Sequence, residues 1–290
     1  MSYYSIYFSP TGGTKKVADI FVGQLEGEYR DIDLCSDIEP MSLNDEDICL
    51  ISVPSYGGRV PAINIERLKK IKGNGAKAIL NCVYGNRHWE DTLTELQDVL
   101  ECLGFVCVSA IAAVAEHSIF RQFGAGRPDA EDVTQLSAFA KKIQEKLDTK
   151  VFGQLELTGN HGDYKVYNGA PFKPEGDEKC IACGICAKKC PVSAIDFNNT
   201  KITDKEKCIS CMRCVGICPV HARDFDAEFM NALAEKKHQS LVGIKKIICS
   251  CNLTKESVGM DWIITFAVCF MATLSAINEV YYIKTGKEVF

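Results

Sequence analysis

The residues best able to do chemistry are cysteines in two short runs, at 180–191 and 208–219. In each run three cysteines are separated by two residues, and a fourth follows after three more residues and precedes a proline. Thiolates spaced in this way along a tight loop can converge on corners of a cubane iron-sulfur cluster. The spacing therefore predicts two 4Fe-4S clusters.

Two other uses of these cysteines fit less well. Zinc sites favour two pairs of cysteines separated by a longer gap. Disulfides need an oxidising compartment, whereas the first residues of this sequence show no charged leader and no small-residue cleavage site, so we expect a cytoplasmic protein. The other eight of the sixteen cysteines lie mostly in apolar runs and are expected to behave as small hydrophobes.

The two runs, offset by 28 positions (208 − 180), resemble the bacterial ferredoxins that carry two 4Fe-4S clusters. That resemblance implies crossed ligand sets, because the fourth cysteine of each run binds the cluster of the other run. Gly184 and Gly216 are expected where positive φ or close backbone approach is needed. The implied ligands are Cys180, Cys183, Cys186 and Cys218 for cluster one, and Cys208, Cys211, Cys214 and Cys190 for cluster two.

The first 150 residues alternate between short apolar runs and helix-length segments. Strands are expected at 3–8, 30–34, 47–53, 76–83 and 105–115, and helices near 14–26, 62–70, 89–103 and 130–148. This alternation predicts an α/β fold, a doubly wound parallel sheet with helices on both faces. Five strands in about 150 residues match the flavodoxin-like order 2-1-3-4-5.

The first expected strand runs directly into a turn rich in hydroxyl groups and glycine, followed by a helix. Its candidate ligand-binding residues are Ser9, Thr11, Gly12, Gly13 and Thr14. Hydroxyls, turn amides and a helix N-terminus together suit one phosphate group without a cation. The turn resembles the phosphate loop of flavodoxins, which implies FMN, and it lacks the patterns typical of ATP and NAD sites. The alternative is an ordinary capped helix start.

Two further loops follow the third and fourth expected strands, where open α/β sheets bind their ligands. The flavodoxin resemblance implies that these loops flank the flavin ring, with Tyr56 and Tyr84 as ring contacts. Backbone groups near the ring would come from Pro54, Ser55, Gly57, Gly58, Gly85 and Asn86. In the alternative reading each tyrosine covers an edge of the sheet. Arg59, Arg87 and the segment 116–118 could also face this crevice.

The sequence divides into a flavodoxin-like domain at 1–150, a linker at 151–170, a two-cluster ferredoxin domain at 171–226 and a helical extension at 227–290. The extension is expected to begin with a helix over 227–239. An apolar segment at 262–283 favours a buried or docked helix over a membrane anchor. The net charge of −5 argues against a nucleic-acid partner.

Over residues 3–225 the sequence resembles the flavodoxin-ferredoxin fusion proteins of anaerobic bacteria and archaea. That resemblance implies an electron-transfer oxidoreductase in which FMN and two 4Fe-4S clusters exchange electrons with an external redox protein, and no separate catalytic residue. Two alternatives remain open. One is a flavin-dependent reductase of a small molecule, in which the clusters supply the electrons to the flavin. The other is a redox sensor or scaffold.

Overall fold

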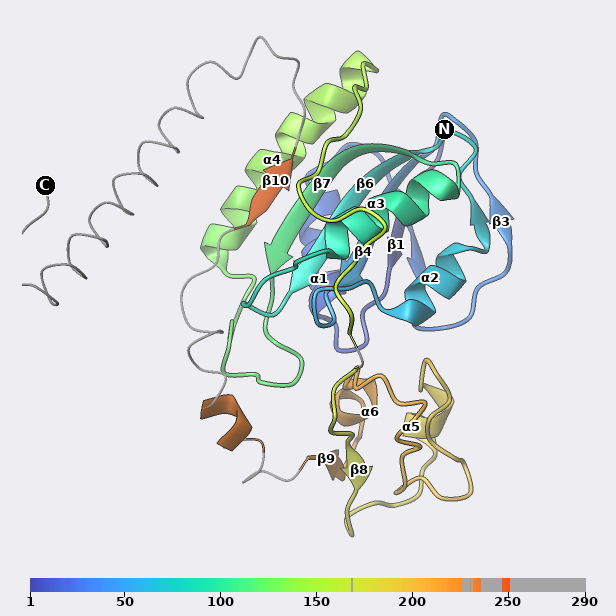
Figure 1. Ribbon diagram of the computed structural model, residues 1–290, viewed down its shortest axis with the longest axis vertical. Coiled ribbons are helices and arrows are strands. Elements are labelled where there is room, and N and C mark those ends of the chain that lie inside the picture. Colours follow the sequence, from blue (N-terminus) through green and yellow to red (C-terminus); the bar gives the residue numbers. More distant parts are fainter. Residues whose placement is uncertain (168, 226–229, 231, 236–246, 251–290) are drawn as a thin grey trace, which may run out of the picture. The chain divides into compact units, whose positions relative to one another are not determined.

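The computed structural model describes residues 1–167, 169–225, 230, 232–235 and 247–250. Its central feature is a six-stranded sheet in the order β10-β7-β6-β4-β1-β2 (Figure 1). Five strands are parallel: β1 (Tyr3–Tyr7), β2 (Tyr29–Asp33), β4 (Ile48–Pro54), β6 (Lys77–Tyr84) and β7 (Val106–Val114). Each corresponds to an expected strand, and numbered among themselves they have the order 2-1-3-4-5. The predicted flavodoxin-like fold is confirmed.

The structure adds short strands that the sequence pattern did not indicate. Strand β10 (Ile248–Ser250) extends the sheet by pairing antiparallel with β7. Strands β3 (Met41–Ser42) and β5 (Ile71–Lys72) form a separate parallel pair. Segments of two or three residues are too short for a periodic pattern to reveal them. An antiparallel edge strand on a parallel sheet is a common arrangement.

Four helices cover the sheet: α1 (Gly13–Val22), α2 (Ala62–Leu68), α3 (Thr92–Cys102) and α4 (Ala130–Thr149). Helices α1 and α4 share one hydrophobic cluster with the sheet, which includes Phe21 and Ile143. Helices α2 and α3 belong to the opposite cluster, which includes Leu68 and Leu96. Because both faces are covered, the central strands are apolar nearly throughout, and all of β4 except its last residue is buried.

Residues 151–167 form no helix or strand. This connector contacts α3 through hydrogen bonds with the side chains of Gln97 and Asp98. Leu155 enters the core of the sheet domain, and its carbonyl accepts a hydrogen bond of 2.8 Å from the Gln97 side chain. Farther along, the carbonyl of Lys165 accepts a hydrogen bond of 2.7 Å from Arg59. The connector is therefore fixed to the sheet domain before the chain enters the cysteine-rich region.

The cysteine-rich region contains two short helices, α5 (Ile185–Lys188) and α6 (Arg213–Gly216), and a strand pair, β8 (Glu175–Gly176) with β9 (Arg223–Asp224). Each helix follows a residue with positive φ, Gly184 at 72° and Met212 at 62°. The expectation for Gly184 therefore holds, but Gly216 lies inside α6. The 28-residue offset makes Met212 the counterpart of Gly184, so a residue with a side chain occupies the strained position in the second run.

The sheet and the cysteine-rich region belong to one compact unit, Met1–Cys251. The buried Arg67 connects them, since its guanidinium donates hydrogen bonds to the carbonyls of Leu34 and Pro191, the latter at 2.6 Å. Ile209 packs against the core cluster of the sheet. Phe172 forms edge-on ring contacts with Phe120 at 6.3 Å and with Phe225 at 5.2 Å.

Little of the expected C-terminal extension falls within the described residues. Residues 230 and 232–235 are helical, inside the helix expected at 227–239. The apolar segment at 262–283 lies outside the described residues. Of the helices that the structure describes, none has the length and hydropathy needed to cross a membrane.

Candidate cofactor sites

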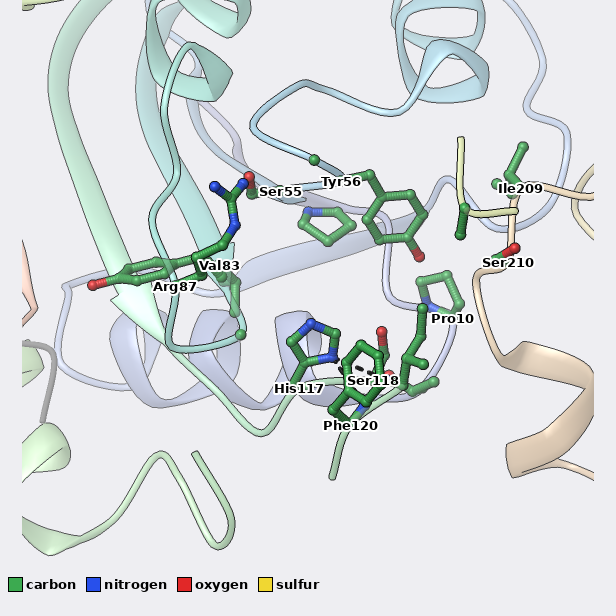
Figure 2. A pocket seen from close by; sticks show the side chains of 18 of the residues that line it. Pro10, Ser55, Tyr56, Val83, Arg87, His117, Ser118, Phe120, Ile209 and Ser210 are labelled. Carbon is green, nitrogen blue, oxygen red and sulfur yellow. Dashed lines mark hydrogen bonds between the residues drawn. The ribbon is translucent and has the colours of Figure 1, made fainter. Parts of the chain in front are cut away.

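A cavity of about 510 Å³ lies at the carboxyl end of the parallel strands (Figure 2). Its volume falls in the range of small-molecule and cofactor sites. The loops that follow β1, β4, β6 and β7 line it, together with parts of 165–172 and Ile209 and Ser210 from the cysteine-rich region. Arg87 and residues 116–118, which were also expected to face this crevice, line the cavity, whereas Arg59 does not. The lining further includes nine of the thirteen residues expected to bind the cofactor: Thr11, Gly13, Thr14, Pro54, Ser55, Tyr56, Gly57, Tyr84 and Gly85. The other four, Ser9, Gly12, Gly58 and Asn86, lie in the same loops without lining the cavity.

The turn between β1 and α1 has the features needed to bind an anion. Gly12 precedes the helix in a left-handed conformation, with φ of 90°. Ser9 Oγ accepts a hydrogen bond of 2.9 Å from the amide of Lys15, which leaves the hydroxyl hydrogen to donate. The amides of Gly13 and Thr14, in the first turn, have no acceptor within the helix. The Lys15 ammonium pairs with Asp19 and Asp31, so this turn offers neutral donors.

The loop after β4 lies beside the cysteine-rich region. Gly57 has φ of 61°, and a Cβ atom there would come within 2.2 Å of the Tyr167 ring. Tyr56 packs against the core of the sheet, as Ile209 does. Burial raises the pKa of Tyr56 well above its usual value, and the nearby thiols of Cys211 and Cys35 raise it further. Tyr56 therefore lies between the sheet cavity and the second cysteine run.

Tyr84 is placed differently from Tyr56. Its side chain is 4% exposed and its ring packs edge-on against Trp89, with centroids 5.3 Å apart. Burial and then Cys82 raise its pKa to about 12. Contacts of Tyr56 and Tyr84 with a flavin ring stay predictions.

Charged and polar groups of the cavity loops form ion pairs and hydrogen bonds with neighbouring groups. Glu90 pairs with Arg87 and, at 2.5 Å, with Lys165. Burial opposes ionisation of Glu90, but the hydrogen bonds from Arg87 and Lys165 outweigh it and lower its pKa to about 2. His117 Nδ1 accepts hydrogen bonds of 3.1 Å from the amides of Ile119 and Phe120, which places the proton of a neutral imidazole on Nε2. Figure 2 shows the His117 ring at the wall of the cavity.

Sequence reasoning missed the cavity residues that come from outside the sheet loops: Lys165, Tyr167, Gly169, Ala170, Pro171, Phe172, Ile209 and Ser210. These residues follow the sheet domain in the chain and reach the cavity through tertiary contacts. Ser210 Oγ, for example, donates a hydrogen bond of 2.9 Å to the carbonyl of Phe172. No local motif marks such residues, because their role depends on how the connector folds back.

The cysteines of the two runs line two separate small cavities. One is lined by Cys180, Cys183, Cys186 and Cys218, and the other by Cys190, Cys208, Cys211 and Cys214. Each cavity therefore combines three cysteines of one run with the fourth cysteine of the other, which is the grouping implied by the ferredoxin resemblance. Among the described residues, no three His, Cys, Asp or Glu side chains could together hold a single metal ion. The role of the eight thiols as cluster ligands stays a prediction.

The surroundings of these cavities suit anionic sulfur. The amides of Ala194 and Ala222 donate hydrogen bonds of 3.2 Å to Cys190 Sγ and Cys218 Sγ. The Nε atoms of Arg213 and Arg223 are buried without a hydrogen-bond partner, and each arginine lines one of the cavities. Donors directed at sulfur and nearby positive charge both stabilise a cluster held by four thiolates.

The thiols respond to the same surroundings. Burial raises the pKa of Cys186 and of Cys214, and the positive charge of Arg223 opposes that rise in both. A hydrogen bond with Thr200 lowers the pKa of Cys180. Outside the two runs, burial raises the pKa of Cys49, Cys82 and Cys107. These buried thiols behave as small apolar residues.

Comparison with known proteins gives one family match, to the 4Fe-4S dicluster domain, over residues 179–222. No curated protein matches the chain. Among solved structures the chain is similar to a flavodoxin from Streptococcus pneumonia TIGR4, with 21% identity, 52% of this chain and 100% of that chain covered, and a TM-score of 0.39. It is also similar to Flavodoxin 1 from Bacillus cereus, with 17% identity, 49% and 95% coverage, and a TM-score of 0.35.

A third similar structure is an FMN-dependent NADH-azoreductase from Bacillus anthracis, with 13% identity, 52% and 99% coverage, and a TM-score of 0.33. The fold assignment rests on the strand order of this chain. The cluster assignment rests on the family match. The chain thus combines a flavodoxin-like fold with a 4Fe-4S dicluster domain.

Proposed function

We propose that this chain is an electron-transfer protein that holds FMN in the cavity of the sheet and one 4Fe-4S cluster in each cysteine cavity. A flavin exchanges one or two electrons and each cubane exchanges one, so together these groups would couple two-electron to one-electron chemistry. The single observation that supports the proposal best is that Ile209 lines both the sheet cavity and the cavity of the second cysteine set.

The protein's own residues have defined tasks in this proposal. The turn at 9–14 would bind the FMN phosphate through hydroxyls and amides. Tyr56 and Ile209, which pack against the core of the sheet, would separate the flavin site from cluster two, and Lys173 holds the Cys208 loop by donating a hydrogen bond of 2.6 Å to its carbonyl. An external redox protein would contact the region around Cys183, which is exposed.

The first test counts the groups that the chain carries. The full chain is purified anaerobically, and iron, sulfide and flavin are measured per chain. We expect about eight irons and eight sulfides, since each cubane holds four of each. A preparation with full occupancy and markedly fewer irons would contradict the two-cluster assignment.

A second test examines the flavin site separately. The chain depleted of flavin is titrated with FMN and with riboflavin, which lacks the phosphate. We expect tighter binding of FMN, and Thr11→Val and Thr14→Val should weaken FMN binding about tenfold each while leaving riboflavin binding unchanged. Thr134→Val, on the exposed face of α4, is the matched control. Equal affinity for the two ligands would exclude the proposed phosphate site.

A further inference from the structure

The two fourth cysteines begin closely similar segments, 190–197 and 218–225, that differ at two pairs of positions: Ser193 with His221, and Ile195 with Arg223. The local geometry is also the same in both segments. The amide of the residue four positions after each cysteine, Ala194 or Ala222, donates a hydrogen bond of 3.2 Å to the sulfur of that cysteine. The apolar side chain of Ile195 in the first half therefore corresponds to the cationic side chain of Arg223 in the second half.

Arg223 is buried, with 2% of its surface exposed. Its guanidinium donates hydrogen bonds to the carbonyl oxygens of Thr200 and Pro174, the latter at 2.9 Å, and to Thr203 Oγ1. All three acceptors are neutral, and Nε has no partner. The Cys214 side chain also lies close to the guanidinium, which favours its thiolate form. Because neutral oxygens do not offset the charge of a buried cation, this site favours negative charge close by.

The acceptors of Arg223 belong to the walls of both cysteine cavities. Thr200 and Arg223 itself line the cavity of Cys180, Cys183, Cys186 and Cys218. Thr203 and Pro174 line the cavity of Cys190, Cys208, Cys211 and Cys214. The guanidinium therefore lies in the partition between the two cavities, where one positive charge is close to both sets of cysteines.

We propose that Arg223 is a shared positive charge that raises the reduction potentials of both 4Fe-4S clusters. This inference rests on the proposed function, since it requires both clusters. Adding an electron to a cluster makes it more negative, and a fixed cation in a buried site of low dielectric constant favours that step. Ile195 leaves the equivalent position of the first half without charge, so one residue acts on both clusters.

The test uses the full chain, loaded anaerobically and assayed for iron and sulfide, with redox titrations followed by electron paramagnetic resonance. Arg223→Met removes the charge and keeps much of the side-chain volume. We expect it to lower both midpoint potentials by at least about 59 mV, which corresponds to a tenfold change in the equilibrium constant of each one-electron reduction. Arg223→Lys, which keeps the charge, should retain most of the potential, and Ile195→Met is the matched control that should change neither midpoint.

The outcomes separate this inference from the proposed function. Wild-type protein without about eight irons would contradict the proposed function itself. Wild-type and Arg223→Met chains with equal iron and equal midpoints would overturn only the role of Arg223, as would a shift in just one cluster. Arg223→Gln, which removes the charge but still offers N–H donors from its side-chain amide, is measured alongside. Loss of clusters from both neutral variants would overturn the proposal in favour of a purely structural role.

Discussion

The two halves of the cysteine-rich region have the same motif and opposite surroundings. In the second half, Ile209 packs against the sheet, Cys211 is buried, and Phe225 packs edge-on against Phe172. Their counterparts 28 residues earlier are exposed: Ile181 by 63%, Phe197 by 64%, and Cys183 as well. A repeat that is symmetric in sequence thus becomes asymmetric because one half is covered by the sheet domain.

The largest expected difference between the halves is in resistance to iron removal. A chelator should release iron in two phases, with about four irons lost first, because Cys183, the proposed ligand of cluster one, is exposed, whereas Cys211, the proposed ligand of cluster two, is buried. Iron release is followed optically under anaerobic conditions. Cys183→Ala should abolish the fast phase and Cys211→Ala the slow phase. Release in a single phase would contradict the asymmetry.

A polar substitution at the paired isoleucines should affect stability unequally. Ile209→Asn places an amide against the core of the sheet, and we expect it to lower the free energy of unfolding by about 3 kcal/mol. Ile181→Asn, on the exposed counterpart, should change it by less than about 0.5 kcal/mol. Urea denaturation of the cluster-loaded chain measures both. Similar losses in the two variants would show that the first half is also covered.

The paired phenylalanines provide a smaller contrast. Phe225→Ala removes the ring contact with Phe172, and we expect a loss of about 2 kcal/mol. Phe197→Ala should cost less than about 0.5 kcal/mol because that ring is exposed. The same denaturation experiment compares them. If Phe197→Ala were the more damaging change, the assignment of the covered half would be reversed.

The smallest expected effect concerns the pair Arg213 and Ile185, which occupy equivalent positions in α6 and α5. Arg213 Nη2 lies 4.0 Å from Asp33 Oδ2, and the Asp33 side chain is 38% exposed. Asp33→Asn should therefore cost about 0.5 kcal/mol at low salt and nearly nothing at high salt. Asp37→Asn, at an exposed pair with Lys70 within the sheet domain, is the control. A loss of stability from Asp33→Asn that persisted at high salt would exclude a screened ion pair.

Much of the fold could be predicted because its signals are local. The five segments that form the parallel strands are each longer than four residues, and the glycines after the first strand mark a turn. The three-residue β10 could not be found in this way, since its pairing with β7 depends on chain that returns from far along the sequence. Tyr167 and Ile209 could not be predicted as site residues for the same reason, because they reach the cavity only when distant segments pack together.

The sequence by itself determined the spacing of the eight cysteines, the turn at 9–14 and the alternation that builds a parallel sheet, because each depends on residues close together in the chain. The tertiary structure alone decided which cysteine run faces the sheet, that Ile209 borders two cavities, and that Arg223 lies between the two cysteine sets. Those facts depend on burial, and burial is settled only when distant segments pack against one another.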